Sequence, residues 1–466
     1  MTKLPKGTRD YSKEETKIRE EAIAIAKKHF ELHDAGAIDT PVFEMRSLLQ
    51  KEDQYGEETK LIYDLEDQGG EQYSMRYDLT VPFARYVGMN RLSDFKRYHV
   101  AKVYRRDQPS AARGRYREFY QCDFDYVGQS DLMSADAECM KIMDDIFQEL
   151  NVGEFTNKFN HKVLLSGMLE VSKIPADKFK TVCSSIDKLD KQPWSEVREE
   201  LVKAKSIPEE AVDSLKGFIS LRADNPEMSN AELLDALLGK AEGNENVIKG
   251  VEELRQLLEY CEDFKINERI TFDPSLARGL DYYTGIIYET VITKWPFEDA
   301  KKKKKNSKDD NVGSVAAGGR YDGLVKAISG YDVPCVGFSL GIERIFRLIE
   351  RRNEALGTQP RKSSLDVYVI ISGSPDGLKK LIRPRNAMAA SLWEAGLKTA
   401  YPQKSKQKLP RLFDRCEKDE IPIIVLMGEE EYSRGMVKIR DVKTRQEEEV
   451  ALADVPKKVL ERLGRQ

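Results

Sequence analysis

The residues best suited to bind a charged ligand lie in one stretch, residues 95–128. Residues 96–105 predict a strand, Pro109 and Gly114 interrupt the pattern, and residues 115–126 predict a second strand. Alternate side chains of a strand share a face, so one face should carry Arg115, Arg117, Phe119, Gln121, Asp123 and Asp125. That order suits a ligand with a phosphate, a flat base and an amine. The alternative for this stretch alone is a solvated hairpin of mixed charge.

Two further clusters could bind polar parts of a ligand. Asp78 and Thr80 stand at the start of a predicted helix, where either could cap the helix or accept a hydrogen bond from an ammonium group. Arg278 begins the sequence Arg-Gly-Leu-Asp-Tyr-Tyr, in which Gly279 permits a backbone turn and the tyrosine hydroxyls offer donors and acceptors. The tyrosines could be core residues. An arginine beside a buried strand, however, needs an anionic partner.

Two glycine-containing segments follow these clusters. Residues 316–323 contain paired glycines, which allow a ligand to approach the backbone closely. Residues 336–345 predict a strand that turns at Gly341 into a helix, whose first turn carries Glu343 and Arg344. A helix start of this kind is common, so this segment is weak evidence by itself.

The elements around these clusters predict a core with two additions. Apolar residues in 16–33 and 131–150 have helical spacing, and the Met-rich face of the second helix predicts core packing. Residues 155–262 predict an all-helical insertion. Residues 365–466 alternate apolar strands with helices, which predicts a small α/β domain with a partly parallel sheet. The lysine-rich run 300–311 predicts a solvated loop.

Composition narrows the class of protein. The 466 residues suffice for two or three domains, and 40% hydrophobic and 33% charged residues are ordinary for a globular protein. The sequence has no signal-peptide pattern, no membrane-spanning apolar run and no Cys-x-x-Cys pair, which predicts a cytoplasmic protein with reduced thiols and no membrane association. The four histidines form no metal-binding pattern, so no intrinsic metal site is expected.

Two observations limit how this chain could bind nucleotides and nucleic acids. A net charge of −4 leaves any nucleic-acid contact to local basic patches. The sequence contains neither a P-loop nor a Gly-x-Gly-x-x-Gly turn after a strand. If the protein binds ATP, it does so through another arrangement.

Residues 113–125, RGRYREFYQCDFD, resemble motif 2 of class II aminoacyl-tRNA synthetases in the form typical of eukaryotic histidyl-tRNA synthetases. The segment that begins at Arg278 resembles the signature that distinguishes histidyl-tRNA synthetases, and residues 316–323 resemble their second histidine-specific segment. Residues 336–345 resemble motif 3, and the strand before Pro41 is similar to motif 1, which forms the dimer interface in class II enzymes. The resemblance extends from Leu4 to near the C-terminus.

The resemblance implies a complete site for histidine. In the family, a carboxylate and a threonine near the start of a helix bind the α-amino group of histidine. Asp78 and Thr80 match these residues, and Gln121 would also contact the amino group. Asp125 would accept a hydrogen bond from the imidazole, while Arg105 and Arg278 would neutralise the α-phosphate and the histidine carboxylate. The implied catalytic residues are Arg105, Gln121 and Arg278. The implied histidine-binding residues are Asp78, Leu79, Thr80, Arg105, Gln121, Asp125, Arg278, Tyr282 and Tyr283.

The resemblance also implies a site for ATP with Mg²⁺ bridging the phosphate oxygens. Arg344 would lie over the adenine and reach the γ-phosphate, with Phe119 on the opposite face of the base. Asp107 departs from the family, which commonly has a glutamate there, and its shorter side chain puts that contact in doubt. The implied ATP-binding residues are Arg105, Asp107, Arg115, Phe119 and Arg344.

The expected fold is an α+β catalytic core with an antiparallel sheet and flanking helices. It would comprise residues 1–154 and 263–355, with a helical insertion at 155–262, a linker at 356–364 and an α/β anticodon-binding domain at 365–466. The helical extension that usually precedes the core in eukaryotic members is not expected, because the core begins almost at Met1.

The expected function is that of a homodimeric histidine–tRNA ligase, which joins histidine to tRNA(His) through a histidyl-adenylate. A site that pairs the polar groups of the ring needs no editing domain. Two alternatives are a non-catalytic relative that binds histidine or tRNA as a regulator, and a synthetase of the same subclass for another amino acid.

Overall fold

The computed structural model describes residues 2–49, 61–66, 69–110, 114–279, 282–295, 313–358, 363–404 and 408–465, apart from the side chain of Asp190. The chain divides into two compact units. The first comprises residues 1–10 and 18–357, and the second comprises residues 11–17 and 358–466. The predicted lysine-rich loop at 300–311 lies outside the described residues.

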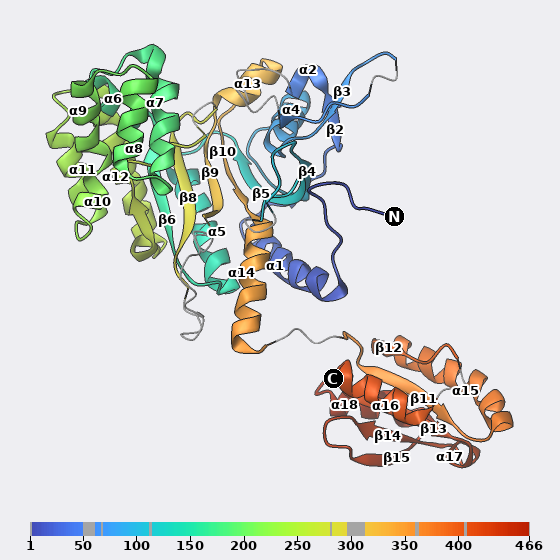
Figure 1. The fold of residues 1–466 in the computed structure, drawn as a ribbon. Helices are drawn as coiled ribbons and strands as arrows, with labels where there is room; N and C mark the ends of the chain where they lie inside the picture. The colour runs from blue at the N-terminus through green and yellow to red at the C-terminus, as the bar shows by residue number, and fades with distance from the viewer. Residues whose placement is uncertain are drawn as a thin grey trace. The chain divides into compact units, whose positions relative to one another are not determined.

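The first unit is organised around an eight-stranded sheet (Figure 1). Its six central strands are antiparallel to their neighbours, whereas the two edge strands β1 and β7 pair in parallel. In spatial order the strands are β1 (Gly36–Ala37), β4 (Phe95–Tyr104), β5 (Glu118–Val127), β10 (Cys335–Leu340), β9 (Ser314–Arg320), β8 (Ile286–Lys294), β6 (Glu154–His161) and β7 (Ile270–Phe272). The predicted hairpin therefore exists, but its second strand begins at Glu118 rather than at residue 115.

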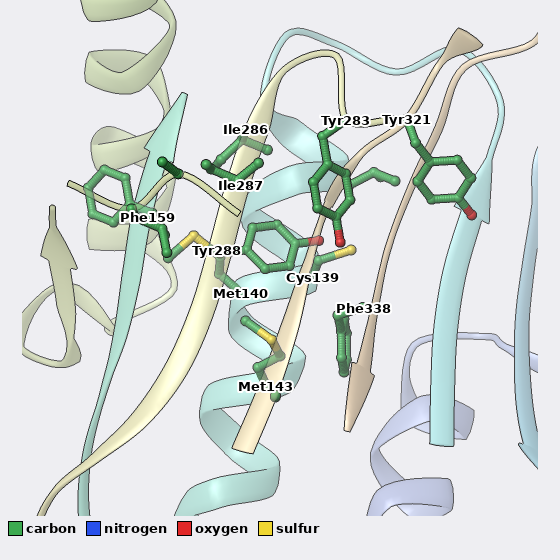
Figure 2. Packing of buried hydrophobic residues seen from close by; sticks show 14 of the residues in the cluster. Cys139, Met140, Met143, Phe159, Tyr283, Ile286, Ile287, Tyr288, Tyr321 and Phe338 are labelled. Carbon is green, nitrogen blue, oxygen red and sulfur yellow. The ribbon is translucent and has the colours of Figure 1, made fainter. Parts of the chain in front are cut away.

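Helices cover the face of the sheet that carries the even-numbered residues of β5. These helices are α1 (Lys13–Leu32), α5 (Ser134–Leu150) and α14 (Ile342–Leu356). Phe30 of α1 packs on Phe124 of β5, with ring centroids 5.6 Å apart. Figure 2 shows Met140 and Met143 of α5 beside Tyr288 of β8, and both methionines are fully buried. The Met-rich face is core, as predicted.

A smaller layer lies beside the hairpin. Strands β2 (Phe43–Met45) and β3 (Tyr73–Met75) pair in antiparallel fashion, and helix α4 (Thr80–Asn90) follows them. Helix α4 packs against α13 (Gly323–Ser329). Helix α2 (Arg46–Leu49) follows β2 directly.

The region between β6 and β7 is helical. It contains α6 (Lys162–Val171), α7 (Phe179–Ile186), α8 (Trp194–Glu199), α9 (Glu209–Ile219), α10 (Leu221–Asp224), α11 (Asn230–Gly239) and α12 (Glu245–Asp263), with the short turns η3 (Ala176–Lys178), η4 (Asp187–Asp190), η5 (Glu200–Ala204) and η6 (Asn267–Arg269). Figure 1 shows these helices gathered beside β6.

The prediction that residues 155–161 are helical is wrong. They belong to β6, a strand of the main sheet. Polar residues are buried on both faces of this strand: Asn157 accepts a hydrogen bond from Thr290 Oγ1 at 2.6 Å, and His161 on the same face and Asn160 on the opposite face are also buried. The usual alternation of apolar and polar residues is therefore missing.

The second unit is a five-stranded sheet with helices, in the strand order β12-β11-β13-β14-β15. Strands β12 (Thr399–Ala400), β11 (Val367–Ser372) and β13 (Ile423–Gly428) are parallel, so the predicted partly parallel sheet is confirmed. The antiparallel strands β14 (Met436–Asp441) and β15 (Glu447–Ala451) were not predicted. The helices are α15 (Pro375–Glu394), α16 (Leu409–Lys418), α17 (Glu429–Ser433) and α18 (Val455–Arg462), with the turn η7 (Leu452–Asp454).

Candidate active site

A cavity of about 1430 Å³ opens on the face of the sheet opposite α1 and α5. With the exception of Leu79, every residue predicted for the site lines this cavity: Asp78, Thr80, Arg105, Asp107, Arg115, Phe119, Gln121, Asp125, Arg278, Tyr282, Tyr283 and Arg344. The side chain of Leu79 is buried in the core, while its carbonyl accepts a hydrogen bond from Arg97 Nη2 at 3.4 Å.

The alternation predicted along the hairpin holds for the strand itself. The odd-numbered residues of β5, from Phe119 to Asp125, line the cavity. Arg115 and Arg117 precede the strand, so alternation does not govern them. Arg115 still lines the cavity, and its backbone pairs with that of Ser110. Arg117 does not line it, and its Nε donates to the carbonyl of Asp107 at 3.2 Å.

The floor of the cavity contains a buried group of charges. Arg97 lies directly opposite Asp125 in the β4–β5 ladder and is fully buried. Its Nη2 is 2.6 Å from Asp125 Oδ2 and 4.0 Å from Asp123 Oδ2, and its guanidinium lies 4.3 Å from the ring centroid of Phe83. The Tyr321 hydroxyl donates a hydrogen bond to Asp125 Oδ1. Both oxygens of Asp125 therefore have partners from the protein.

A glycine makes room for this arrangement. A Cβ atom at position 337 would lie 2.0 Å from Asp125 Oδ1, so no other residue fits beside that carboxylate without displacing it. Gly337 lies opposite Asp125 in the β5–β10 ladder.

Two acceptors on the floor have neither a hydrogen bond nor an ion pair from a described residue, whereas Asp125 Oδ2 lacks a well-directed hydrogen bond but forms an ion pair with Arg97. Gln121 Nε2 donates to Ser339 Oγ at 3.0 Å, but Gln121 Oε1 and Asp123 Oδ1 are buried without a hydrogen bond from any described residue. Burial raises the pKa of Asp123 to about 7 and that of Asp125 to about 6, although Arg97 opposes both shifts. Buried acceptors are normally satisfied. The floor is therefore suited to a ligand that brings N–H donors.

Asp78 contacts the start of a helix and also lines the cavity. Its Oδ1 accepts a hydrogen bond from the backbone N–H of Val81 at 3.1 Å, which caps the start of α4. The same residue lines the cavity, as does Thr80, the first residue of the helix.

The opposite end of the cavity is rich in arginine. Arg278 forms an ion pair with Glu289 of β8, and its Nη1 also donates to Ser314 Oγ at 3.1 Å. Burial lowers the pKa of Arg344, and the nearby charges of Arg278 and Arg115 lower it further. Three guanidinium groups near one another favour binding of an anion with several oxygen atoms, such as a polyphosphate.

The backbone at Gly279 has the turn expected from the sequence. Its φ of +64° lies in the left-handed region, and a Cβ there would be 2.3 Å from the ring of Tyr283. The rings of Tyr282 and Tyr283 have centroids 4.4 Å apart, and both residues line the cavity. Leu280 and Asp281, which complete this sequence segment, lie outside the described residues.

Arg105 is held between two aromatic rings. Its guanidinium lies 4.1 Å from the ring centroid of Tyr77 and 5.1 Å from that of Phe119, and its Nε donates to the Tyr77 carbonyl at 3.1 Å. Asp107 lies nearby, with its Oδ2 4.0 Å from Arg115 Nη1.

Sequence reasoning missed several residues of the site. Arg97 could have been found from the hairpin, because an antiparallel register sets it opposite Asp125. Glu289, the partner of Arg278, gave no local signal, since β8 reads as an apolar strand. Cavity residues that the sequence did not single out are also Tyr321, Ser339 and, from the helical region, Lys180, Ser184 and Lys191. Asp123 and Glu343, which the sequence did single out, line the cavity too.

Comparison with known proteins identifies the family. The family model described as "Histidyl-tRNA synthetase" matches residues 7–345, which include every cavity residue named above. The chain belongs to the histidyl-tRNA synthetase family. A second model, "Anticodon binding domain", matches residues 366–462.

Curated relatives agree with this assignment. The chain is 44% identical to "Histidine--tRNA ligase" of Danio rerio, over 99% of this chain and 89% of that protein. It is 45% identical to the protein of the same name from Caenorhabditis elegans, over 97% and 86%. It is also 42% identical to "Histidine--tRNA ligase, mitochondrial" of Homo sapiens, over 96% and 85%.

Solved structures confirm the predicted fold class. The histidyl-tRNA synthetase of Nostoc sp. PCC 7120 matches with a TM-score of 0.78 and 26% identity, covering 99% of both chains. A protein from Bacillus halodurans described as "ATP phosphoribosyltransferase regulatory subunit/histidyl-tRNA synthetase" matches in fold, with a TM-score of 0.72 and 19% identity over 92% of this chain and 98% of that one. The fold by itself therefore does not distinguish a synthetase from a regulator.

Proposed function

We propose that this protein is a histidine–tRNA ligase that activates histidine with ATP and transfers it to tRNA(His). The observation that carries the proposal is the polarity of one cavity, which has arginines at one end and buried acceptors at the other. Histidyl-adenylate has the complementary pattern, with phosphate oxygens at one end and an ammonium and an imidazole at the other.

In the first reaction, a carboxylate oxygen of histidine attacks the α-phosphorus of ATP. The bond between the α-phosphorus and the oxygen that bridges to the β-phosphorus breaks, and pyrophosphate leaves. Arg105 and Arg278 neutralise the charge that develops on the α-phosphate. No side chain forms a covalent intermediate, so catalysis depends on positioning and on charge stabilisation.

The amino-acid end of the cavity selects histidine through its polar groups. Gln121 Oε1, which is buried without a partner, accepts from the α-ammonium group together with Asp78 and Thr80. Asp125 accepts from the imidazole, near Tyr283. A site whose buried acceptors need this ring discriminates against an apolar side chain by about 10⁴-fold, because those acceptors would otherwise stay unpaired.

The arginine end binds ATP. Arg115 and Arg344 contact the outer phosphates, and Phe119 stacks on the adenine while Asp107 bonds to the nucleotide. Mg²⁺ bound together with ATP would neutralise negative charge on the phosphates. Carboxylate oxygens suit this ion, and the carboxylates of Glu343 and Asp107 line the cavity.

In the second reaction, a hydroxyl of the terminal ribose of tRNA attacks the adenylate carbonyl, and AMP leaves. The second unit binds the anticodon, a proposal supported by the match to the anticodon-binding model. Lys404, Lys408 and Arg411 are exposed and could meet phosphates, whereas Lys406 lies outside the described residues.

The alternative of a non-catalytic regulator is less well supported. A regulator has no need for the groups that bind ATP phosphates. This chain retains Arg105, Arg115, Arg278 and Arg344 around one cavity, so the enzyme is favoured.

The enzyme acts as a homodimer. Exposed apolar residues gather near the segment that resembles motif 1, namely Val42, Phe43 and Leu65, with Met89 on α4. Sedimentation velocity of the wild type and of Phe43→Asp tests this proposal. A dimer that dissociates in the variant is expected, and a monomeric wild type would contradict it.

The compartment is proposed to be the cytoplasm. Relatives from Takifugu rubripes and Dictyostelium discoideum are named cytoplasmic, and all six cysteines are free. No helix in the described part of the chain is long and apolar enough to cross a membrane. Fluorescent tagging of the full chain at its C-terminus tests the compartment, since a mitochondrial pattern would contradict this proposal.

Exchange of pyrophosphate into ATP tests the activity. The wild type should catalyse exchange with histidine in the absence of tRNA, and addition of tRNA(His) should then yield aminoacylated tRNA. Absence of exchange from folded protein that still binds histidine would favour the regulator.

A further inference from the structure

We propose that Asp123 is a further specificity-determining residue of the histidine site, positioned by Arg97. Its Oδ1 accepts a hydrogen bond from a proton on a nitrogen of the bound amino acid. This inference rests on the proposed function, because it assigns a role within the same cavity.

The position of Asp123 on β5 supports this role. Asp123 lies between Gln121 and Asp125 on the cavity face, and alternate residues of a strand are about 7 Å apart. A histidine whose ammonium meets Gln121 and whose ring meets Asp125 must therefore pass over Asp123.

One oxygen of Asp123 is available to a ligand. Ser339 lies opposite Asp123 in the β5–β10 ladder, and its Oγ accepts a hydrogen bond from Gln121 Nε2 at 3.0 Å. Asp123 Oδ1 has no partner among the described residues, although the residue is 98% buried. An acceptor withdrawn from water and left unpaired beside a cavity gains most from a ligand that donates to it.

The charges on the floor point to the same chemistry. Two carboxylates, of Asp123 and Asp125, face one guanidinium, that of Arg97. Asp125 lies closer to Arg97 and also accepts from Tyr321. Asp123 therefore has the weaker interactions with its neighbours of the two carboxylates, which suits a ligand nitrogen that donates a hydrogen bond to it.

The contacts of Arg97 indicate that it positions the carboxylates of Asp123 and Asp125. The residue has no contact with the cavity, and its Nη2 reaches both carboxylates and the Leu79 carbonyl. It links β4, β5 and the residue before α4. Arg97 acts on the ligand through the two aspartates.

Two variants of Asp123 and one matched control test the proposal. Asp123→Asn keeps the shape and Asp123→Ala removes both oxygens. Asp144→Asn is the control, because Asp144 is equally buried and paired with Arg269 at 2.8 Å but does not line the cavity. Each protein is assayed by pyrophosphate exchange, with the KM for histidine and the KM for ATP measured separately.

The expected result is specific to the amino acid. Both Asp123 variants should raise the KM for histidine by about 10-fold or more, because a buried charged acceptor is lost, and should change the KM for ATP by less than about 2-fold. Asp144→Asn should leave both KM values unchanged even where it lowers the melting temperature. A purely structural role of Asp123 would instead lower the melting temperature or kcat without this selectivity.

Binding of two histidine analogues identifies the nitrogen. If the α-ammonium donates to Asp123, Asp123→Asn weakens binding of histidinol but not of 3-(imidazol-4-yl)propionate, which lacks the amine. If the ring donates, both analogues bind more weakly.

Equal KM values for histidine in the wild type and both Asp123 variants would overturn the inference. The proposed function would survive that result, because it depends on exchange by the wild type. Absence of exchange in the wild type would instead contradict the proposed function itself.

Discussion

The two units of this chain differ in whether their buried polar side chains have hydrogen-bond partners. In the described part of the chain, the buried side-chain atoms that lack a well-directed hydrogen bond all belong to the first unit, on Thr40, Arg97, His99, Gln121, Asp123, Asp125, Asn157 and His161. Asp366 in the second unit is as deeply buried, yet Arg465 donates to both of its oxygens, at 2.8 and 2.9 Å. The cores of that unit are built from apolar side chains.

This difference separates a region that needs a ligand from one that is complete without it. An unpaired buried acceptor costs free energy in the empty protein, and a ligand that pairs with it recovers that cost. The Gln121 and Asp123 acceptors lie beside the cavity, where a ligand can reach them. The anticodon binding that we propose for the second unit would use its surface, so the interior of that unit would not need such groups.

The largest expected effect comes from the arginine end of the cavity. Arg278→Ala should lower pyrophosphate exchange by about 10³-fold or more, because the charge that develops on the α-phosphate loses a preorganised partner. The fold should remain intact by circular dichroism. Because this change leaves Glu289 without its ion pair, the double variant with Glu289→Gln serves as the control. Near-normal exchange in folded Arg278→Ala would contradict the role of Arg278 in stabilising the α-phosphate charge.

Matched arginine substitutions sharpen the comparison between the units. Arg97→Met leaves two buried carboxylates without their cation and should lower the free energy of unfolding by about 3–5 kcal/mol. Arg465→Met leaves one buried carboxylate, that of Asp366, which keeps a hydrogen bond from the Lys398 N–H, so the loss of stability should be clearly smaller. Urea denaturation measures both. Equal losses of unfolding free energy in the two variants would contradict the proposed difference between the units. A raised KM for histidine in Arg465→Met would contradict it as well.

A smaller effect is expected for the partner of Arg278. Glu289→Gln should lower the kcat of exchange by about 10-fold while the KM for histidine changes little, because Glu289 orients Arg278 rather than contacting the amino acid. Restoration of part of the activity by Glu289→Asp would support positioning. An unchanged kcat in Glu289→Gln would contradict it.

The contributions of Asp123 and Asp366 to the free energy of unfolding should change with pH in opposite directions. Burial raises the pKa of Asp123 to about 7 in the folded state, so the unfolded state binds fewer protons between pH 4 and 7. The stability of the wild type relative to Asp123→Asn should therefore fall as pH rises through this range, by more than about 1 kcal/mol.

Asp366 provides the matched comparison. Burial opposes ionisation of Asp366, but hydrogen bonds from Arg465 and from the Lys398 N–H outweigh it and lower the pKa. The stability of the wild type relative to Asp366→Asn should be constant above pH 4 and fall as the pH drops below that. Denaturation curves at several pH values check both trends, and parallel trends would contradict the assignment.

The smallest effect is expected on the surface of the second unit. Arg440 pairs with Glu447 across β14 and β15 at 2.9 Å in an exposed setting. Arg440→Ala should change the free energy of unfolding by less than about 1 kcal/mol and leave exchange with histidine unaltered. A larger loss of stability would contradict the expectation that exposed ion pairs of this unit contribute little to the free energy of unfolding.

The sequence predicted the strands and residues whose pattern is local. Alternation along β5 correctly set Gln121 and Asp125 on one face, and a glycine followed by tyrosines correctly indicated the turn at Gly279. These features depend on residues one or two positions apart. The partly parallel sheet of the second unit followed from the order of its elements in the same way.

Features that depend on distant residues were not predicted. The partner of Arg278 is Glu289, on a strand that reads as apolar, and the partner of Asp125 is Tyr321, nearly two hundred positions away. Strand β6 was assigned to the helical region, since its buried polar residues on both faces leave no alternation typical of a strand. Each of these features becomes visible once the sheet brings the strands together.

The measurement that tests the central claim most directly is pyrophosphate exchange with each of the twenty amino acids, without tRNA. The cavity should support exchange with histidine alone, since both its arginine end and its buried acceptors are then satisfied. Exchange with a different amino acid, or no exchange from folded protein, would contradict the account.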